Sequence, residues 1–426
     1  MTLRITEASD ARALDGLYRR GWFVEPEVSA AVAQILAAVR ERSDDAVIAY
    51  ARQFDAPHFT DGQIRVPVAA AADLRRAIPA AVGDALDIAA DRVRAFHARQ
   101  LTADVEYTDP DGTAYALLNR PLGAIAAYVP GGTAVLPSSV IMTAVPAKVA
   151  GVGRVAVFTP PARDGTVPPA VRYACALCNV DELYAVGGAQ AIAAAAYGTQ
   201  RIAPFDKIVG PGNRWVTEAK RQIFGVCGID GLAGPSEVLV VADESCDPAL
   251  AASEMLAQAE HDPFARVAAV SESRDVLQAC LMHLERREKT GRDDVVRGVL
   301  ERSTYVIHAR GRAEIFSVIQ RFAPEHLALF VRAPREFLPH LQSVGAVFCG
   351  AATPVAWGDY LAGTNHVLPT SGAARFSSGL RTADFLRTFS VLENSAKRAK
   401  DDAAHVAALA TFEGLPNHAR TAEQRA

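Results

Sequence analysis

The stretch GPSEVLVVADESCDPALAASEMLAQAEHDP, residues 234–263, contains the pattern that decides the fold. Glu237–Ala242 is apolar after its first residue and rich in valine, which is typical of a strand covered on both faces of a parallel sheet. Asp247 and Pro248 are residue types that favour the N-cap and the first position of a helix. We therefore expect a buried strand, a loop and a helix that ends near Pro263.

The same alternation of apolar runs and helical patterns continues on both sides of this stretch. Further strands are expected at Gly123–Tyr128, Val155–Phe158, Lys207–Val209, Val267–Val270, Tyr305–His308, Leu327–Val331 and Ala346–Cys349. Strands that alternate with helices favour doubly wound parallel sheets. The sequence therefore predicts an α/β protein with two doubly wound Rossmann-like domains, a helical N-terminal region and a helical C-terminal tail.

The expected domain boundaries rest on the positions of these strands, because no low-complexity linker separates them. We expect an N-terminal arm at 1–22 and a first, discontinuous α/β domain at 23–127 plus 238–382. A second α/β domain is expected at 128–237, followed by a helical C-terminal tail at 383–426.

Composition narrows the class of protein. The 426 residues are 50% hydrophobic and 22% charged, with a net charge of −4, so neither nucleic acid nor an anionic membrane surface is an expected partner. The sequence has no apolar run of membrane-spanning length and no signal-peptide pattern at its start. Its six cysteines are scattered. Cys175 and Cys178 lie in an apolar helical segment and are expected to be core thiols, which suits a cytoplasmic protein.

Several polar side chains could bind a metal ion. Gln258 and His261 are three residues apart near the end of the expected helix and share one face, although an exposed polar face has the same pattern. Asp359 lies in a glycine-containing loop and His418 in the C-terminal tail. These nitrogen and oxygen donors suit a catalytic zinc or a similar divalent ion better than a structural thiolate site.

Other residues could move protons or contact a ligand. Glu325 and His326 adjoin at the start of an expected strand, and both residue types can act as acids or bases near neutral pH, although an ordinary loop pair looks the same. Glycine turns at Gly131-Gly132, Gly187-Gly188 and 210–212 each precede a helix, where open α/β sheets bind ligands. The sequence has no GxGxxG motif, so the glycine turns alone do not identify a dinucleotide as the ligand.

Long motifs resemble one enzyme family over nearly the whole chain, from about Val28 to Arg425. The chain resembles the histidinol dehydrogenases in YVPGGTAVLPSSV, VGGAQAIAAAAYGT, DKIVGPGN, AGPSEVLV, QAEHDP, APEHL, GDYLAGTNHVLPT, ARFSSGL and EGLPNHA. The resemblance implies a cytoplasmic oxidoreductase of histidine biosynthesis that uses zinc and two NAD to oxidise L-histidinol, through L-histidinal, to L-histidine.

The resemblance also implies roles for individual residues. It implies zinc ligands at Gln258, His261, Asp359 and His418, and the acid–base pair at Glu325 and His326. It implies NAD contacts at Tyr128, Gln190 and Asn213. Expected substrate contacts are Ser236, Gln258, His261, His326, Asp359, His366, Glu413 and His418. The family further implies a homodimer in which the C-terminal tail of one subunit reaches the site of the other.

Two alternatives keep some of the same residues. Thr364 stands where the family usually has proline. The stretch SSGLRTADFL is more similar to relatives that oxidise other alcohols, such as dihydroxypropanesulfonate. A zinc hydrolase that uses Glu325 to activate water is a third reading. Reduction of NAD by an alcohol separates the dehydrogenases from the hydrolase.

Overall fold

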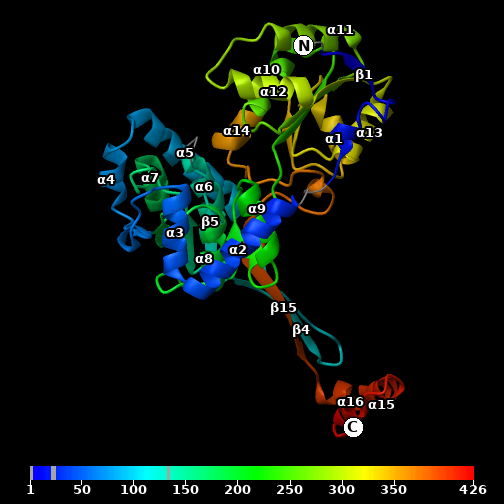
Figure 1. Cartoon of the computed structure of the whole chain (residues 1–426). Helices are drawn as coiled ribbons and strands as arrows, with labels where there is room; N and C mark the ends of the chain where they lie inside the picture. The colour runs from blue at the N-terminus through cyan, green and yellow to red at the C-terminus, as the bar shows by residue number, and fades with distance from the viewer. Residues whose placement is uncertain (1–2, 21–24, 132–134) are drawn as a thin grey trace.

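The computed structural model describes residues 3–20, 25–131 and 135–426. It contains two α/β bodies and an arm that carries the C-terminal helices away from both (Figure 1). Residues 1–2 and 21–22 of the expected N-terminal arm lie outside the described residues, as does Gly132 of the first glycine turn.

The first body, here called the large body, contains a parallel sheet in the order β1-β12-β11-β10-β13-β14. Its strands are β1 (Ile5–Glu7), β10 (Glu237–Ala242), β11 (Arg266–Ser271), β12 (Thr304–His308), β13 (His326–Phe330) and β14 (Ala346–Cys349). One face packs against α10 (Pro248–Ala259), α11 (Arg274–Glu285) and α12 (Asp293–Arg302), and the other against α1 (Asp15–Tyr18) and α13 (Arg312–Phe322). The short helix α14 (Val355–Tyr360) follows β14.

The second body, here called the small body, contains a sheet in the order β2-β7-β6-β5-β8-β9, in which only β2 is antiparallel to its neighbour. Its strands are β2 (Arg65–Val66), β5 (Ala124–Tyr128), β6 (Arg154–Phe158), β7 (Glu182–Tyr184), β8 (Lys207–Val209) and β9 (Gly228–Ile229). Four helices form one layer: α4 (Ala71–Arg76), α5 (Ala80–Ala98), α6 (Pro137–Val149) and α7 (Pro169–Leu177). The other layer holds α2 (Pro26–Arg42), α3 (Asp44–Phe54), α8 (Gly188–Tyr197) and α9 (Arg214–Ile223). The predicted pair of doubly wound sheets is therefore confirmed.

The packing of the N-terminal helices differs from the expected domain boundaries. Val28 and Val93, from 23–127, belong to the core that also contains Ile125 of β5, whereas the large-body cores contain Leu14 and Leu17. The helices between Pro26 and Ala98 therefore pack with 128–237, in a core that also takes in Leu380, and part of the expected N-terminal arm completes the large sheet as β1. An amphipathic stripe tells which side of a helix is buried, but it does not tell which sheet buries it.

The arm is an antiparallel sheet in the order β15-β4-β3. Its strands are β3 (Val105–Thr108), β4 (Ala114–Pro121) and β15 (Leu386–Glu393), and α15 (Ala396–Phe412) and α16 (Pro416–Glu423) follow. The expectation that the tail from 383 onward is helical throughout is wrong at β15. That strand pairs with β4, far away in the sequence, so no local turn pattern announces the pairing.

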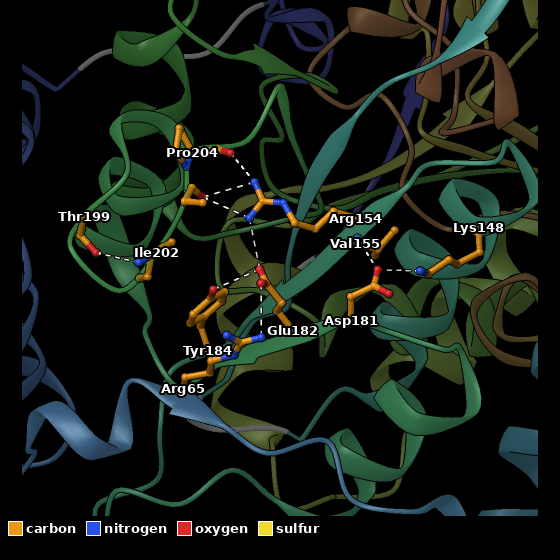
Figure 2. A network of polar contacts seen from close by, with 11 residues as sticks. Arg65, Lys148, Arg154, Val155, Asp181, Glu182, Tyr184, Thr199, Ile202 and Pro204 are labelled. Carbon is orange, nitrogen blue, oxygen red and sulfur yellow. Dashed lines mark hydrogen bonds and ion pairs between the residues drawn. The ribbon is translucent and has the colours of Figure 1, made fainter.

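A network of ion pairs and hydrogen bonds ties together β2, β6 and β7 of the small body (Figure 2). Arg65 Nη2 and Arg154 Nη1 each lie 3.3 Å from an oxygen of Glu182, and the hydroxyl of Tyr184 donates to Glu182 Oε2 over 3.1 Å. Arg154 and Glu182 begin the parallel strands β6 and β7, so their ion pair lies at the opposite end of the sheet from the glycine turns.

Candidate active site

The acid–base pair predicted from the sequence lies at the start of β13, and the backbone of a neighbouring strand holds it. The side chains of Glu325 and His326 are both buried. The N–H of Glu237 donates to Glu325 Oε2 over 2.8 Å. His326 Nδ1 lies 2.9 Å from the carbonyl oxygen of Glu237 and therefore carries the proton that it donates there. In the neutral ring this leaves Nε2 with a free lone pair that can accept a proton.

Burial shifts the two pKa values in opposite directions. It lowers the pKa of His326 below its ordinary value, and the negative charge of Asp359 opposes this shift. It raises the pKa of Glu325 well above its ordinary value; the hydrogen bond from the N–H of Glu237 opposes this, and the charges of Glu237 and Asp359 add to it. Burial therefore favours the unprotonated form of His326, which can act as a base, and the protonated form of Glu325.

Helices α10 and α14 bring together three of the four predicted zinc ligands. Asp247 caps α10 by accepting from the N–H of Ala249, as the sequence predicts, although α10 ends at Ala259 rather than near Pro263. Gln258 lies in its last turn with 3% exposure, and His261 follows just beyond its end. Glu254, one turn before Gln258, accepts from the N–H of Val355 over 3.0 Å and so docks the helix that carries Asp359 onto α10.

Two histidines share the electrostatic surroundings of this cluster. His366 Nδ1 donates to the carbonyl oxygen of Asp359 over 2.9 Å. Burial lowers the pKa of His366, and among its neighbours Asp359 raises that pKa while His261 lowers it. The pKa of His326 also responds to Asp359 and His261. The side chains of His261, His326, Asp359 and His366 therefore lie close to one another.

The donors in this cluster fit a zinc ion, but one chain does not complete the predicted set. Gln258 is almost fully buried, and its Nε2 atom has no hydrogen-bond partner among the described residues. No group of three His, Cys, Asp or Glu side chains within residues 3–20, 25–131 and 135–426 is placed to hold a metal. The predicted set contributes only His261 and Asp359 of these types from the large body. His418, the fourth residue of the predicted set, does not lie in the large body.

The remaining predicted substrate contacts divide into two places. Ser236 directly precedes β10 and adjoins Glu237, beside the acid–base pair. Glu413 and His418 are exposed and belong to the C-terminal helices, which lie at the far end of the arm (Figure 1). Within one chain, the fold does not bring these two residues to the cluster.

The predicted NAD contacts lie at the carboxyl ends of strands in the small sheet. The chain runs from β5 to β6 and β7 on one side and then returns to β8 on the other, so the strand order reverses between β5 and β8. Tyr128 ends β5, and its hydroxyl accepts from the N–H of Gly188 over 3.0 Å. Gln190 is 1% exposed, and neither polar atom of its side chain has a hydrogen-bond partner in the described chain.

Asn213 completes this second group. Its Oδ1 caps α9 by accepting from the N–H groups of Trp215 and Val216, so its amide NH₂ is the part left to face a ligand. The buried, unpaired amide of Gln190 and the reversal of strand order both fit a dinucleotide at this edge.

Sequence reasoning missed one residue of the site, Glu237, whose backbone holds both members of the acid–base pair. Its side chain is fully buried. The sequence signal that could have identified Glu237 is its charge, because it is the first residue of an otherwise apolar strand. The amino ends of β10 and β13 form this part of the site, so the preference of ligands for carboxyl strand ends did not point to it.

Comparisons with known proteins show the family of this chain. The family model described as histidinol dehydrogenase matches residues 19–426. The chain belongs to the histidinol dehydrogenase family.

The histidinol dehydrogenase of Ruegeria pomeroyi is 44% identical over 403 residues, which cover 94% of this chain and 92% of that protein. That of Methanothermobacter thermautotrophicus is 40% identical over 426 residues, which cover 100% and 99%. The crystal structure of histidinol dehydrogenase from Elizabethkingia anophelis has a TM-score of 0.93 at 30% identity and covers 99% of this chain and 98% of that one.

Membership of the histidinol dehydrogenase family makes this protein an oxidoreductase, so the interpretation as a hydrolase is not favoured. The interpretation as an enzyme for another alcohol is not favoured either, because relatives that match over most of the chain are named histidinol dehydrogenase. Among the described residues, no helix combines the length and the apolar character that a membrane span requires.

Proposed function

We propose that this protein oxidises L-histidinol, through L-histidinal, to L-histidine in the last step of histidine biosynthesis, with two NAD as oxidants. The observation that carries the proposal is the buried Glu325–His326 pair beside Gln258, His261 and Asp359, in a chain that matches the histidinol dehydrogenase family over residues 19–426.

The two side chains of the pair divide the proton transfers. In the first half-reaction a hydride leaves the carbinol carbon and His326 Nε2 takes the hydroxyl proton. In the second half-reaction a water adds to the aldehyde before the next hydride leaves, and Glu325, once ionised, takes a proton from that water. General-base help of this kind contributes a factor of about 10² to 10⁴ in rate.

Zinc and NAD are the cofactors of this proposal. Gln258, His261 and Asp359 would hold the zinc together with one residue from outside the large body. The zinc, when bound, acts as a Lewis acid that orients the substrate. Tyr128, Gln190 and Asn213 would hold NAD, which accepts the hydride. We assign Ser236 and His366 to contacts with the rest of the substrate, because Ser236 adjoins Glu237 and His366 donates to the carbonyl oxygen of Asp359.

The decisive experiment counts NADH formed per histidinol consumed by purified, zinc-loaded protein. Two NADH per histidinol, with histidine as the product, support the proposal. Absence of NADH with histidinol, together with NAD reduction by another alcohol such as dihydroxypropanesulfonate, would leave the chemistry in place and reject this substrate.

We further propose a homodimer in which each tail completes the site of the other subunit. Helix α15 exposes large apolar side chains, with Leu409 66% and Phe412 90% exposed. The large body exposes Phe264, Trp357 and Tyr360 near His261 and Asp359. Exposed apolar surfaces of this kind favour an interface. A partner's tail docked on this patch would bring Glu413 and His418 to the ligand cluster.

Coexpression of two differently tagged variants tests this arrangement. One copy carries His326→Ala and the other His418→Ala, and the mixed dimer is purified through both tags. With the tail acting between subunits, one of the two sites keeps both wild-type residues, so the mixed dimer retains about half of the wild-type activity. A tail that acts within its own subunit would leave both sites defective, and the mixed dimer would be as inactive as either homodimer.

A further inference from the structure

We propose that Glu237, through its side-chain ion pair with Arg266, is a positioning residue for the acid–base pair, because it fixes the one peptide segment that holds both Glu325 and His326. This inference rests on the proposed function, since it assigns a task to a residue beside the site of that reaction.

The backbone of Glu237 contacts both members of the pair. Its N–H donates to Glu325 Oε2 over 2.8 Å, and its carbonyl oxygen accepts from His326 Nδ1 over 2.9 Å. The first bond aims the carboxyl group, and the second fixes both the plane and the tautomer of the imidazole. A small displacement of this residue would therefore move the acid and the base together.

The side chain of Glu237 anchors this backbone from the other side. Glu237 is 0% exposed, and its Oε1 pairs with Arg266 Nη2 of the adjacent strand β11, directly opposite in the register. Arg266 is held in turn by the carbonyl oxygens of Leu17 and Arg19, at 3.2 and 2.9 Å. The ring of Phe322 from α13 also lies 5.7 Å from its guanidinium. The anchor therefore spans the N-terminal segment, β11, β10 and β13.

Burying the ion pair of Glu237 and Arg266 costs free energy that a contact with a purely structural role would not require. The charged side chain of Glu237 is fully buried. Burial raises the pKa of Glu237 to about 7 against the opposing effect of Arg266. Two apolar residues of similar size would avoid this burial of charge, and such replacements in other proteins are often neutral or stabilising. A rigid, directional anchor behind the acid–base pair gives the charged pair a task that an apolar pair could not perform.

The test compares Glu237→Gln with Glu182→Gln. Both changes remove the charge of a carboxylate paired with arginine and keep its shape, but Glu182 is only partly buried and lies in the small-body network of Figure 2. For Glu237→Gln we expect kcat to fall by about ten- to a hundred-fold in both half-reactions, while KM for histidinol, zinc content and NAD binding stay near wild type. For Glu182→Gln we expect wild-type kcat.

A second measurement reports how firmly the backbone around Glu237 and the acid–base pair is held, and it does not depend on turnover. Amide hydrogen exchange in peptides covering 234–240 and 323–330 should be faster in Glu237→Gln than in the wild type. Arg266→Lys removes the fork of the guanidinium but keeps its charge, and it should give the same pattern. The double variant Glu237→Gln with Arg266→Lys should lose no more kcat than the single variants, because both act through one anchor.

Three outcomes would overturn the proposal: an unchanged kcat in Glu237→Gln, equal losses of kcat in Glu237→Gln and Glu182→Gln, or unchanged amide exchange in both peptides. If the wild-type protein did not oxidise histidinol, the proposed function would fail, but the exchange experiment would still decide whether Glu237 positions the pair.

Discussion

Glu325 and His326 are neighbours in sequence and equally buried, yet burial acts on their pKa values in opposite directions. Burial disfavours the charged form of each group, which is the carboxylate of Glu325 and the imidazolium of His326. Burial therefore favours the unprotonated form of His326 and the protonated form of Glu325. Because the proposed first half-reaction uses His326 as the base and the second uses Glu325, the two half-reactions should respond differently to pH.

Replacement of Glu325 by Gln should slow the oxidation of histidinal more than the oxidation of histidinol. The amide keeps the shape and can still accept from the N–H of Glu237, but it cannot take a proton from water. Rates measured separately with histidinol and with histidinal check this. Equal losses in both half-reactions would assign Glu325 to a step that they share.

The two half-reactions should also differ in pH dependence. The pKa of His326 is lowered, so its basic form persists below pH 6.5 and the first half-reaction falls only at lower pH. The pKa of Glu325 is raised, so its basic form, and with it the second half-reaction, should increase as the pH rises. Single-turnover rates with each substrate across a pH series check this, and superimposable profiles would contradict it.

At the scale of single elements, α10 connects helix capping to the ligand cluster. Its first turn is fixed by Asp247, and its last turn carries Gln258. The capping pattern and the valine-rich strand before it were predicted from local sequence because both depend on neighbouring residues. The contact of α10 with α14 through Glu254 was not predicted, because α14 is about a hundred residues away.

Replacement of Asp247 by Ala should lower the free energy of unfolding by about 1 kcal/mol, because the N–H of Ala249 loses its acceptor at the start of the helix. Chemical denaturation monitored by circular dichroism measures the change. Glu244→Ala is the matched control, since it removes a nearby exposed acid that caps no helix. A loss of the same size in the control would mean that charge, and not capping, is responsible.

At the scale of the whole molecule, the two bodies fold around their own cores and the tail stands apart. The hydrophobic cores of the described chain contain no side chain of α15 or α16. The tail therefore contributes little to the stability of either body, and its exposed apolar residues are available to a second copy.

Deletion of 396–426 should therefore leave both bodies folded but abolish turnover and reduce the protein to a monomer. Thermal unfolding, sedimentation and NADH formation measure the three expectations. A truncated protein that turns over histidinol at the wild-type rate would remove His418 from the site.

Removal of zinc with a chelator should abolish turnover and leave the secondary structure largely intact. The cores of the large body are apolar and include none of Gln258, His261 and Asp359, so we expect the fold not to depend on a metal. Circular dichroism and activity before and after readdition of zinc check this. Full activity in metal-free protein would contradict the assignment of Gln258, His261 and Asp359.

The sequence by itself determined the alternation of strands and helices, the cap of α10, and the position of the acid–base pair at the start of β13. These features depend on residues close together in the chain. The motifs also identified the family. Only the tertiary structure decided that α2 and α5 cover the small sheet, that β15 pairs with β4, and that Glu237 lies behind Glu325 and His326. Each of these contacts joins residues far apart in sequence, so a local sequence pattern cannot identify the contact partner.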